Sequence, residues 1–153
     1  MLLGVPSRNT QWQILDRGPA HFHISITIER DRANRTITLS QVTLIDHIVS
    51  QFSLSDTHPI STLLEPGLCL SKANSPQTNE ECADVAHLPY RELIRSLMYL
   101  SIGTRPDIAF AVNHLCCFLD CFGQAHWEAA KRIVHYLKGS RDLHLVLGGE
   151  HTM

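Results

Sequence analysis

The clearest pattern of apolar and polar positions lies between Tyr90 and Lys138. Apolar side chains recur there every three to four residues in three successive stretches, separated by Gly103 and Gly123. This spacing is typical of amphipathic helices that bury one face. The three stretches therefore predict the core of the molecule, formed by Tyr90, Leu93, Ile94, Leu97 and Leu100, by Ile108, Ala111, Val112, Leu115 and Leu119, and by Trp127, Ala130, Ile133, Val134 and Leu137.

The first part of the chain has a different period. Residues 22–29 and 35–39 alternate apolar with polar positions, which is the period of a half-buried strand. The polar residues 30–34 between them predict a β-hairpin with a longer loop. Residues 42–52 return to helical spacing, and Ser40 is the predicted N-cap of that helix.

The remaining segments are weakly patterned. Residues 1–21 show little periodicity, with a turn at Gly18-Pro19, and residues 55–86 are predicted to be a long loop. Residues 143–147 alternate briefly and predict a last short strand with no obvious partner. The pattern as a whole predicts an α+β fold, with an N-terminal β-hairpin, a mostly α-helical region over 40–149 and a short C-terminal strand.

Length and charge add modest constraints. A chain of 153 residues with 44% hydrophobic residues is enough for one domain with a core. The net charge of −2 calls for neither nucleic acid nor a membrane surface. Residues 1–41 and 89–141 are mildly basic and flank an acidic segment, so a local basic face is one interpretation and ordinary surface charge is the other.

The cysteines favour a reducing environment. Their number is odd, and the spacing of Cys69, Cys82, Cys116, Cys117 and Cys121 is not that of a disulfide framework. No window approaches the length of a membrane span, and no signal peptide is recognisable. We therefore expect an intracellular protein, cytoplasmic or nuclear, that is not secreted and does not contact a membrane.

Few residues suggest chemistry. Asp107 follows Thr104 by three positions, so capping of a helix explains it better than catalysis does. No two carboxylates lie on a strand-and-turn unit that would hold two Mg²⁺ ions. His114, Cys117 and Cys121 would share one helix face, which makes a zinc site one interpretation. Their spacing matches no closed zinc motif, and packing as small apolar residues is the simpler interpretation for these cysteines and Cys116.

Four blocks follow one another in the helical region. They are Tyr-Arg-Glu-Leu-Ile-Arg-Ser-Leu-Met-Tyr-Leu at 90–100, Gly-Thr-Arg-Pro-Asp-Ile-Ala-Phe-Ala-Val at 103–112, His-Trp-Glu-Ala-Ala-Lys-Arg at 126–132 and Tyr-Leu-Lys-Gly at 136–139. In order and spacing they resemble the reverse transcriptase (RNA-directed DNA polymerase) of Ty1/copia-type retrotransposon Pol polyproteins. Shorter similarities at 18–22, 39–41, 61–62 and 65–67 extend the resemblance over nearly the whole chain.

The resemblance implies which part of that enzyme this chain corresponds to. It is similar to the segment after the palm's metal-binding Asp-Asp hairpin, with a primer-grip-like hairpin at 22–39 and a helical thumb/connection-like region at 40–149. A complete palm and RNase H domain are missing, so we expect no catalytic residues and no autonomous catalysis. The Mg²⁺ of the full-length enzyme would then belong to the missing parts, and no cofactor or metal is expected in this chain.

The same resemblance suggests partners and contact residues. The expected partners are an RNA/DNA primer–template and the missing palm and RNase H portions of the polyprotein. The candidate phosphate contacts are Arg91, Arg95, Lys131, Arg132 and Lys138, although solvated surface charge explains each of them equally well. The chain departs from the family pattern where Ser25 and Arg95 stand at positions that usually carry Gly.

Three interpretations remain open from the sequence. The chain is a fragment that binds nucleic acid, a co-opted structural fragment that docks on a partner through exposed helix faces, or a relic of a reading frame that barely folds.

Overall fold

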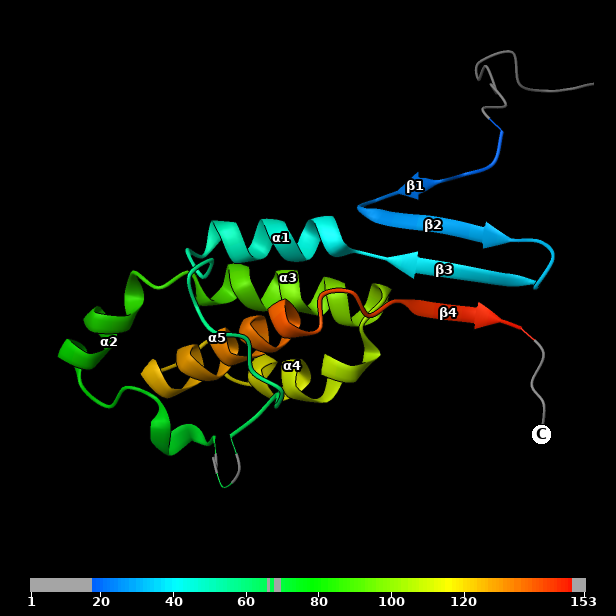
Figure 1. Ribbon diagram of the computed structural model, residues 1–153. Helices are drawn as coiled ribbons and strands as arrows, with labels where there is room; N and C mark the ends of the chain where they lie inside the picture. The colour runs from blue at the N-terminus through cyan, green and yellow to red at the C-terminus, as the bar shows by residue number, and fades with distance from the viewer. Residues whose placement is uncertain (1–17, 66, 68–69, 150–153) are drawn as a thin grey trace, which may run out of the picture.

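The computed structural model describes residues 18–65, 67 and 70–149 of the chain. In chain order the elements are β1 (Phe22–His23), β2 (Ile26–Asp31), β3 (Thr36–Ser40), α1 (Val42–Gln51), η1 (Lys72–Asn74), α2 (Asn79–Ala86), α3 (Tyr90–Gly103), η2 (Pro106–Ile108), α4 (Ala109–Cys116), α5 (Gln124–Gly139) and β4 (Leu145–Gly148). Within the described residues, helices α1, α3, α4 and α5 form a bundle, helix α2 lies at one end of it, and four strands form one antiparallel sheet at the other end (Figure 1). The expected α+β fold is confirmed.

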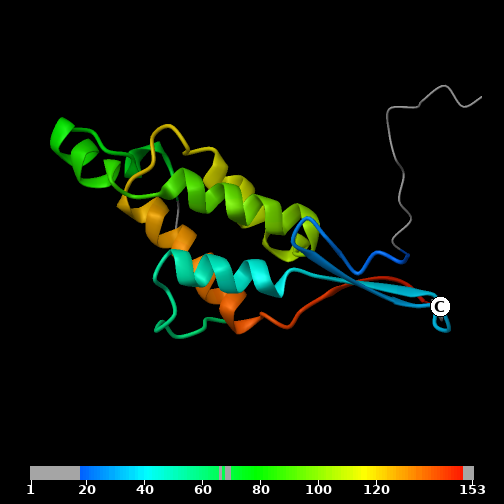
Figure 2. The ribbon, with the colours of Figure 1, turned by 90° about the horizontal axis from the view of Figure 1, so that it is seen from above.

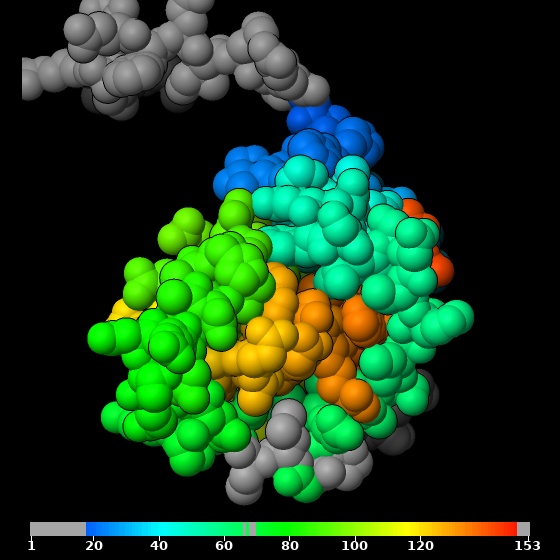
Figure 3. All heavy atoms as spheres, turned by 90° about the vertical axis from the view of Figure 1, so that its left-hand side faces the viewer, coloured from blue at the N-terminus to red at the C-terminus, as the bar shows by residue number. Residues whose placement is uncertain are grey.

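The helices form because their apolar faces meet in one core. Every residue of the three predicted apolar sets is buried, apart from Leu119, which is half-buried against the others. Helix α5 lies between α1 and α3, and in Figure 3 its orange atoms are visible between the green and the cyan ones. Burial of about 20 apolar side chains at roughly 1.5–3 kcal/mol each makes this bundle the main source of stability.

The predicted strand over residues 22–29 is interrupted by a tight turn. Ile24 and Ser25 both have positive φ, 46° and 60°, and the chain reverses there. As a result β1 and β2 pair with each other, with Phe22 opposite Thr27. The alternation of residues 22–29 continues across the turn, and neither Gly nor Asn marks it, which is why the pattern alone suggested one strand.

The C-terminal strand β4 has a partner that the sequence did not reveal. It pairs with β3 in an antiparallel register, with Leu145 opposite Leu39 and Leu147 opposite Ile37. The sheet order is therefore β1-β2-β3-β4. More than a hundred residues separate β3 from β4 along the chain, so no local pattern could have paired them.

The sheet projects beyond the helices and has one apolar face. Figure 2 shows it extending away from the bundle at the opposite end from α2. The registers of the strands place aliphatic side chains on the same face. These side chains are half-buried or exposed, and among the described residues they do not belong to the helical core; they are Ile26, Ile28, Ile37, Leu39, Leu145 and Leu147.

Residues 55–86 are not entirely a loop. Helix α2 occupies the last eight of them, and Thr78 caps it by accepting a hydrogen bond from the Glu81 N–H at 3.2 Å while Glu81 bonds back. The low apolar content of α2 hid it, because only Val85 is buried. Of the weakly patterned segment 1–21, residues 1–17 lie outside the described residues.

Two predicted helix caps are wrong. Ser40 belongs to β3, and Gln41 is the N-cap of α1. Thr104 ends α3, and its hydroxyl donates to Gln41 Oε1 at 2.9 Å instead of capping the next helix. In both cases the sequence shows a hydroxyl residue that suits an N-cap. The structure instead places Ser40 in a strand and uses the Thr104 hydroxyl in a tertiary hydrogen bond.

Asp107 is also not a capping residue, because it pairs with a buried arginine. The Arg105 side chain is 2% exposed, and its guanidinium donates to both Asp107 carboxylate oxygens, at 3.0 and 2.7 Å. The same guanidinium donates to the carbonyl and hydroxyl of Ser140, at 3.0 and 2.6 Å. Residues 104–107 thus bind both connections between bundle and sheet, at Gln41 and at Ser140.

Replacing Ser25 with Gly tests the strain in the β1–β2 turn. A residue with a Cβ at positive φ costs about 1 kcal/mol or more, and Gly does not. We expect Ser25→Gly to raise the free energy of unfolding by about 0.5–1 kcal/mol and Tm by about 2–3 °C in thermal melts. The matched control is Ser96→Gly inside α3, which should destabilise by about 0.5 kcal/mol. A decrease in Tm for Ser25→Gly would contradict the strain that the positive φ of Ser25 implies.

The ion pair of Asp107 predicts a pH dependence of stability. Burial would raise the pKa of Asp107, but hydrogen bonds from Arg105 and Tyr136 outweigh it and hold the pKa below its usual value. The ionised pair therefore stabilises the fold above about pH 4, and this contribution is lost as pH falls through the lowered pKa.

We expect Asp107→Asn to lower the free energy of unfolding by about 2 kcal/mol in urea melts at neutral pH. This is below the usual cost of breaking a buried pair, because the Asp107 side chain is 35% exposed. The difference from wild type should narrow as pH falls below about 4. Asp56→Asn, at an exposed position, is the control and should change little. An Asp107→Asn effect that is the same at low and neutral pH would refute the role of its charge.

Candidate nucleic-acid interface

Arg91 and Arg95 lie one turn apart on the exposed side of α3. Arg91 donates to the Leu119 carbonyl at 2.9 Å and to Asp120 Oδ1 at 3.0 Å. That ion pair is open to solvent on both sides, so it holds Arg91 only weakly. Arg95 is exposed and has no hydrogen-bond or ion-pair partner among the described residues, which leaves its charge available to a ligand.

The same side of α3 meets the β1–β2 turn. Tyr99, one turn after Arg95, donates its hydroxyl to the Ile24 carbonyl. Ile102 continues this side of the helix and is 80% exposed. We call this surface the α3 face; its members are Arg91, Arg95, Met98, Tyr99 and Ile102, with the β1–β2 turn at its edge. A hollow of about 310 Å³ beside Arg91, Arg95 and Met98 opens onto it.

The three predicted contacts on α5 are engaged within the chain. Arg132 donates to Thr62 Oγ1 at 2.9 Å, and Lys138 donates to the carbonyls of Ser55 and Thr57, the latter at 2.7 Å. These bonds hold the segment 55–62 against α5. Lys131 forms an ion pair with Glu128 at 2.8 Å, so the Glu128–Arg132 pair that helical spacing suggests is not formed.

His135 shows that the α5 cations lie close together. Burial lowers its pKa first, and Lys131, Lys138 and Arg132 lower it further by charge repulsion, against an opposing effect of Glu128. The hollow beside them, about 300 Å³, is also lined by Glu65 and Glu128. The two carboxylates balance the charges of Lys131 and Arg132, so this cluster has less free positive charge than its sequence suggests.

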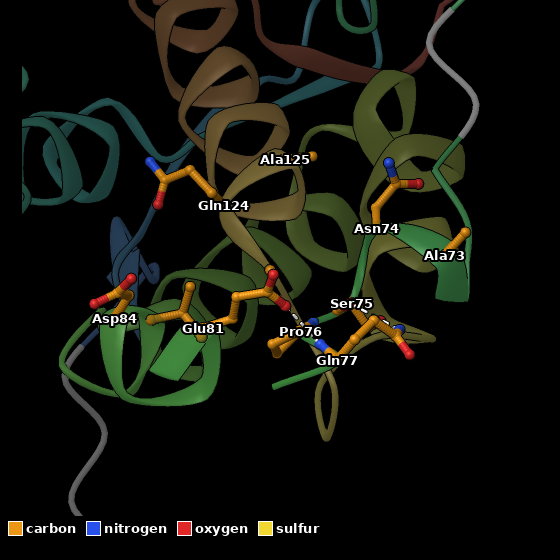
Figure 4. A pocket seen from close by; sticks show the side chains of 11 residues that line it. Ala73, Asn74, Ser75, Pro76, Gln77, Glu81, Asp84, Gln124 and Ala125 are labelled. Atoms are coloured by element: carbon orange, nitrogen blue, oxygen red, sulfur yellow. Dashed lines mark hydrogen bonds between the residues drawn. The ribbon is translucent and has the colours of Figure 1, made fainter. Parts of the chain in front are cut away.

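A larger hollow of about 450 Å³ separates α2 from the start of α5. Figure 4 shows Glu81 and Asp84 of α2 and Gln124 of α5 around it. Glu81 is occupied by backbone N–H groups of the α2 cap, and Gln124 donates to Glu128 Oε1 at 2.8 Å. The described residues that line this hollow serve the ends of their helices and do not form a nucleophile–base pair.

The described residues do not form a metal site. Over 18–65, 67 and 70–149, no three His, Cys, Asp or Glu side chains gather closely enough to hold an ion. The zinc interpretation of His114, Cys117 and Cys121 therefore does not fit the structure. The described residues likewise form no cluster of carboxylates that would fit the Mg²⁺ ions that the resemblance assigns to a full-length enzyme. Within the same ranges, no helix is long and apolar enough to cross a membrane.

The sequence identifies the basic residues, but it does not show which of them are exposed and free to bind a ligand. Arg105 was missed as a structural residue, and no local signal distinguishes a buried arginine from an exposed one. Arg30 and Arg32 were also missed, although three arginines within residues 30–35 mark the β2–β3 turn as basic. Both are exposed.

Known proteins resemble this chain over most of its length. It is 41% identical over 134 residues to the retrovirus-related Pol polyprotein from transposon TNT 1-94 of Nicotiana tabacum, a match that covers 88% of this chain and 10% of the polyprotein. It is 30% identical to the retrovirus-related Pol polyprotein from transposon RE1 of Arabidopsis thaliana, over 86% of this chain and 8% of that protein. An uncharacterized mitochondrial protein of Arabidopsis thaliana, AtMg00810, is 29% identical, over 86% of this chain and 51% of its own length.

Other comparisons set limits on this similarity. No family model matches the chain, and no solved structure matches it. The chain spans about a tenth of the two polyproteins, so their activities do not transfer to it directly. Identity of 41% over 88% of the chain nevertheless goes well beyond shared composition. Over this length the chain is similar to a segment of the retrovirus-related Pol polyproteins of copia-type transposons, which confirms the resemblance to copia-type Pol sequences.

Proposed function

We propose that the chain is the thumb and connection part of a copia-type reverse transcriptase and that it positions an RNA/DNA primer–template without performing the chemistry. The observation that carries this proposal is the α3 face, where the unpaired cation of Arg95 lies one turn from Tyr99. Tyr99 in turn holds the β1–β2 turn, so a helix and a hairpin present one continuous surface.

The physical argument is electrostatic. Cations that contact phosphates displace condensed counterions, and this provides most of the sequence-independent affinity for a duplex. Arg95 is free to make such a contact at no cost to the fold, whereas Arg91 must first leave Asp120. Breaking that exposed pair costs less than about 1 kcal/mol, so Arg91 remains a second contact.

The α5 cations have a supporting place in this proposal. Lys131 is paired with Glu128 at the surface and can exchange that partner for a phosphate at low cost. Arg132 and Lys138 would have to release segment 55–62 first. We therefore rank the proposed contacts as Arg95, then Arg91 and Lys131, then Arg132 and Lys138. Any Mg²⁺ would be held by the palm of a full-length enzyme.

Exposed apolar side chains favour a second candidate function. Ile102 and Phe110 are 80% and 77% exposed, at the end of α3 and the start of α4. Large apolar side chains at a surface often mark a protein contact. The second candidate is therefore an interaction fragment that docks on another part of the polyprotein through these residues and does not bind nucleic acid.

Charge reversal at Arg95 tests the proposed function. The measurement is fluorescence anisotropy of a labelled blunt RNA/DNA hybrid at two salt concentrations. We expect wild-type affinity to fall as salt rises, and Arg95→Glu to weaken binding about tenfold and reduce the salt slope by about 1. Lys72→Glu in the η1 turn makes the same change in net charge and is the matched control.

Two outcomes would contradict the proposal. Wild-type binding that is absent or independent of salt would show that the proposed phosphate contacts are not made. An equal loss in Lys72→Glu would assign the effect to net charge rather than to the α3 face. If, in addition, Ile102→Ser and Phe110→Ser abolish binding of a hydrophobic dye or self-association, the interaction fragment becomes the better description.

A further inference from the structure

Another hollow lies at the other end of the sheet from the α3 face. It measures about 920 Å³ and opens beside the β2–β3 turn, between the strands and residues 18–21. Ile28 and Ile37 form its apolar floor, since the strand register places them on one face together with Arg30. In Figure 1 this turn is at the end of the sheet farthest from the helices, so the described helices leave it accessible.

Two arginines at the hollow have no acidic partner. Arg30 and Arg32 are exposed and form no ion pair with any described residue, whereas Arg91, Arg105 and Arg141 each pair with a carboxylate. Asp31 stands between them in sequence and also lines the hollow, but the turn uses its carboxylate.

The Asp31 carboxylate is committed to three local donors. It accepts hydrogen bonds from the N–H groups of Ala33 and Asn34 at 2.9 and 3.1 Å and from Asn34 Nδ2 at 2.7 Å. The backbone hydrogen bond from Asn34 is the main reason that the pKa of Asp31 is lowered. Its charge offsets part of the local positive potential, yet three of its acceptor sites are taken by the turn and it forms no ion pair with either arginine.

The ring-bearing residue His21 also lines the hollow, and its backbone is fixed because its carbonyl accepts a hydrogen bond from the Ile28 N–H at 2.8 Å. An aliphatic floor, an imidazole ring and two free guanidinium groups are the chemistry that single-stranded nucleic acid requires. Unpaired bases rest on rings and apolar surface while the backbone follows the cations. A duplex hides its base faces and cannot use such a floor.

The geometry points to a site for the unpaired end of a nucleic-acid strand, with Arg30 and Arg32 on its phosphates and a base over His21, Ile28 and Ile37. This inference rests on the proposed function in that the ligand is nucleic acid. It uses different residues from the α3 face and a different form of the ligand, so the two can fail separately.

The test uses the full chain and two labelled probes of the same sequence, a single-stranded 12-mer RNA and the blunt RNA/DNA hybrid. We expect Arg30→Gln/Arg32→Gln to weaken single-strand binding about tenfold and to reduce its salt slope by about 1.4, which is two contacts at about 0.7 each. Binding of the hybrid should change by less than about twofold. Arg35→Gln is the matched control, because Arg35 lies in the same turn but lines another hollow.

Each outcome decides the inference. It is overturned if the double variant binds the single strand as tightly as wild type does, or if Arg35→Gln weakens single-strand binding as much as the double variant does. It is also overturned if poly-glutamate of equal charge competes as well as RNA, since the hollow would then suit acidic peptides. If hybrid binding is absent while the single strand still requires Arg30 and Arg32, the proposed function fails and this site remains. Unchanged thermal melts of the variants exclude unfolding as the cause.

Discussion

The buried guanidinium of Arg105 is the constraint on which the arrangement of sheet and helices depends. A charge that is 2% exposed requires partners, and it finds them in Asp107 and in the backbone and hydroxyl of Ser140. Ser140 caps the end of α5, just before β4. Thr104, which precedes Arg105, donates its hydroxyl to Gln41, the residue that joins β3 to α1. Three residues, Thr104, Arg105 and Asp107, therefore fix both points at which the chain passes between bundle and sheet.

This fixed junction explains how a sheet outside the core still has a defined place. Its side chains are not part of the apolar core, so packing alone would leave its orientation loose. The junction and the contact of Tyr99 with the β1–β2 turn hold one end of β2 against α3, and the β2–β3 turn is carried outward (Figure 1). The two proposed contact zones, for duplex and for single strand, thus lie at opposite ends of one hairpin.

Whether the sequence could predict a feature depends mostly on how far apart along the chain the interacting residues lie. The helical core was predictable because apolar periodicity is local, and all three sets are buried as expected apart from the half-buried Leu119. The partner of β4 was not predictable, since it lies far along the chain, and the turn at Ile24-Ser25 was not, since it has no Gly. The role of Asp107 was not either: its partner Arg105 is only two positions away, but no local pattern shows that this arginine is buried. The same holds for the site. Basic residues are visible in the sequence, but Arg132 is engaged by Thr62, 70 positions away, and Arg95 is not.

The two departures from the resembling enzymes, Ser25 and Arg95, fall on one surface. Ser25 lies in the turn that Tyr99 holds, and Arg95 lies one turn before Tyr99 on α3. Glycine at both positions would relax the turn and let a duplex approach the helix backbone closely. Serine keeps the turn strained, and arginine would hold a duplex farther from the helix backbone while offering a charge that salt screens. If this surface meets a primer–template as proposed, its affinity depends on a phosphate contact at a distance rather than on close fit, and therefore on ionic strength more than on shape.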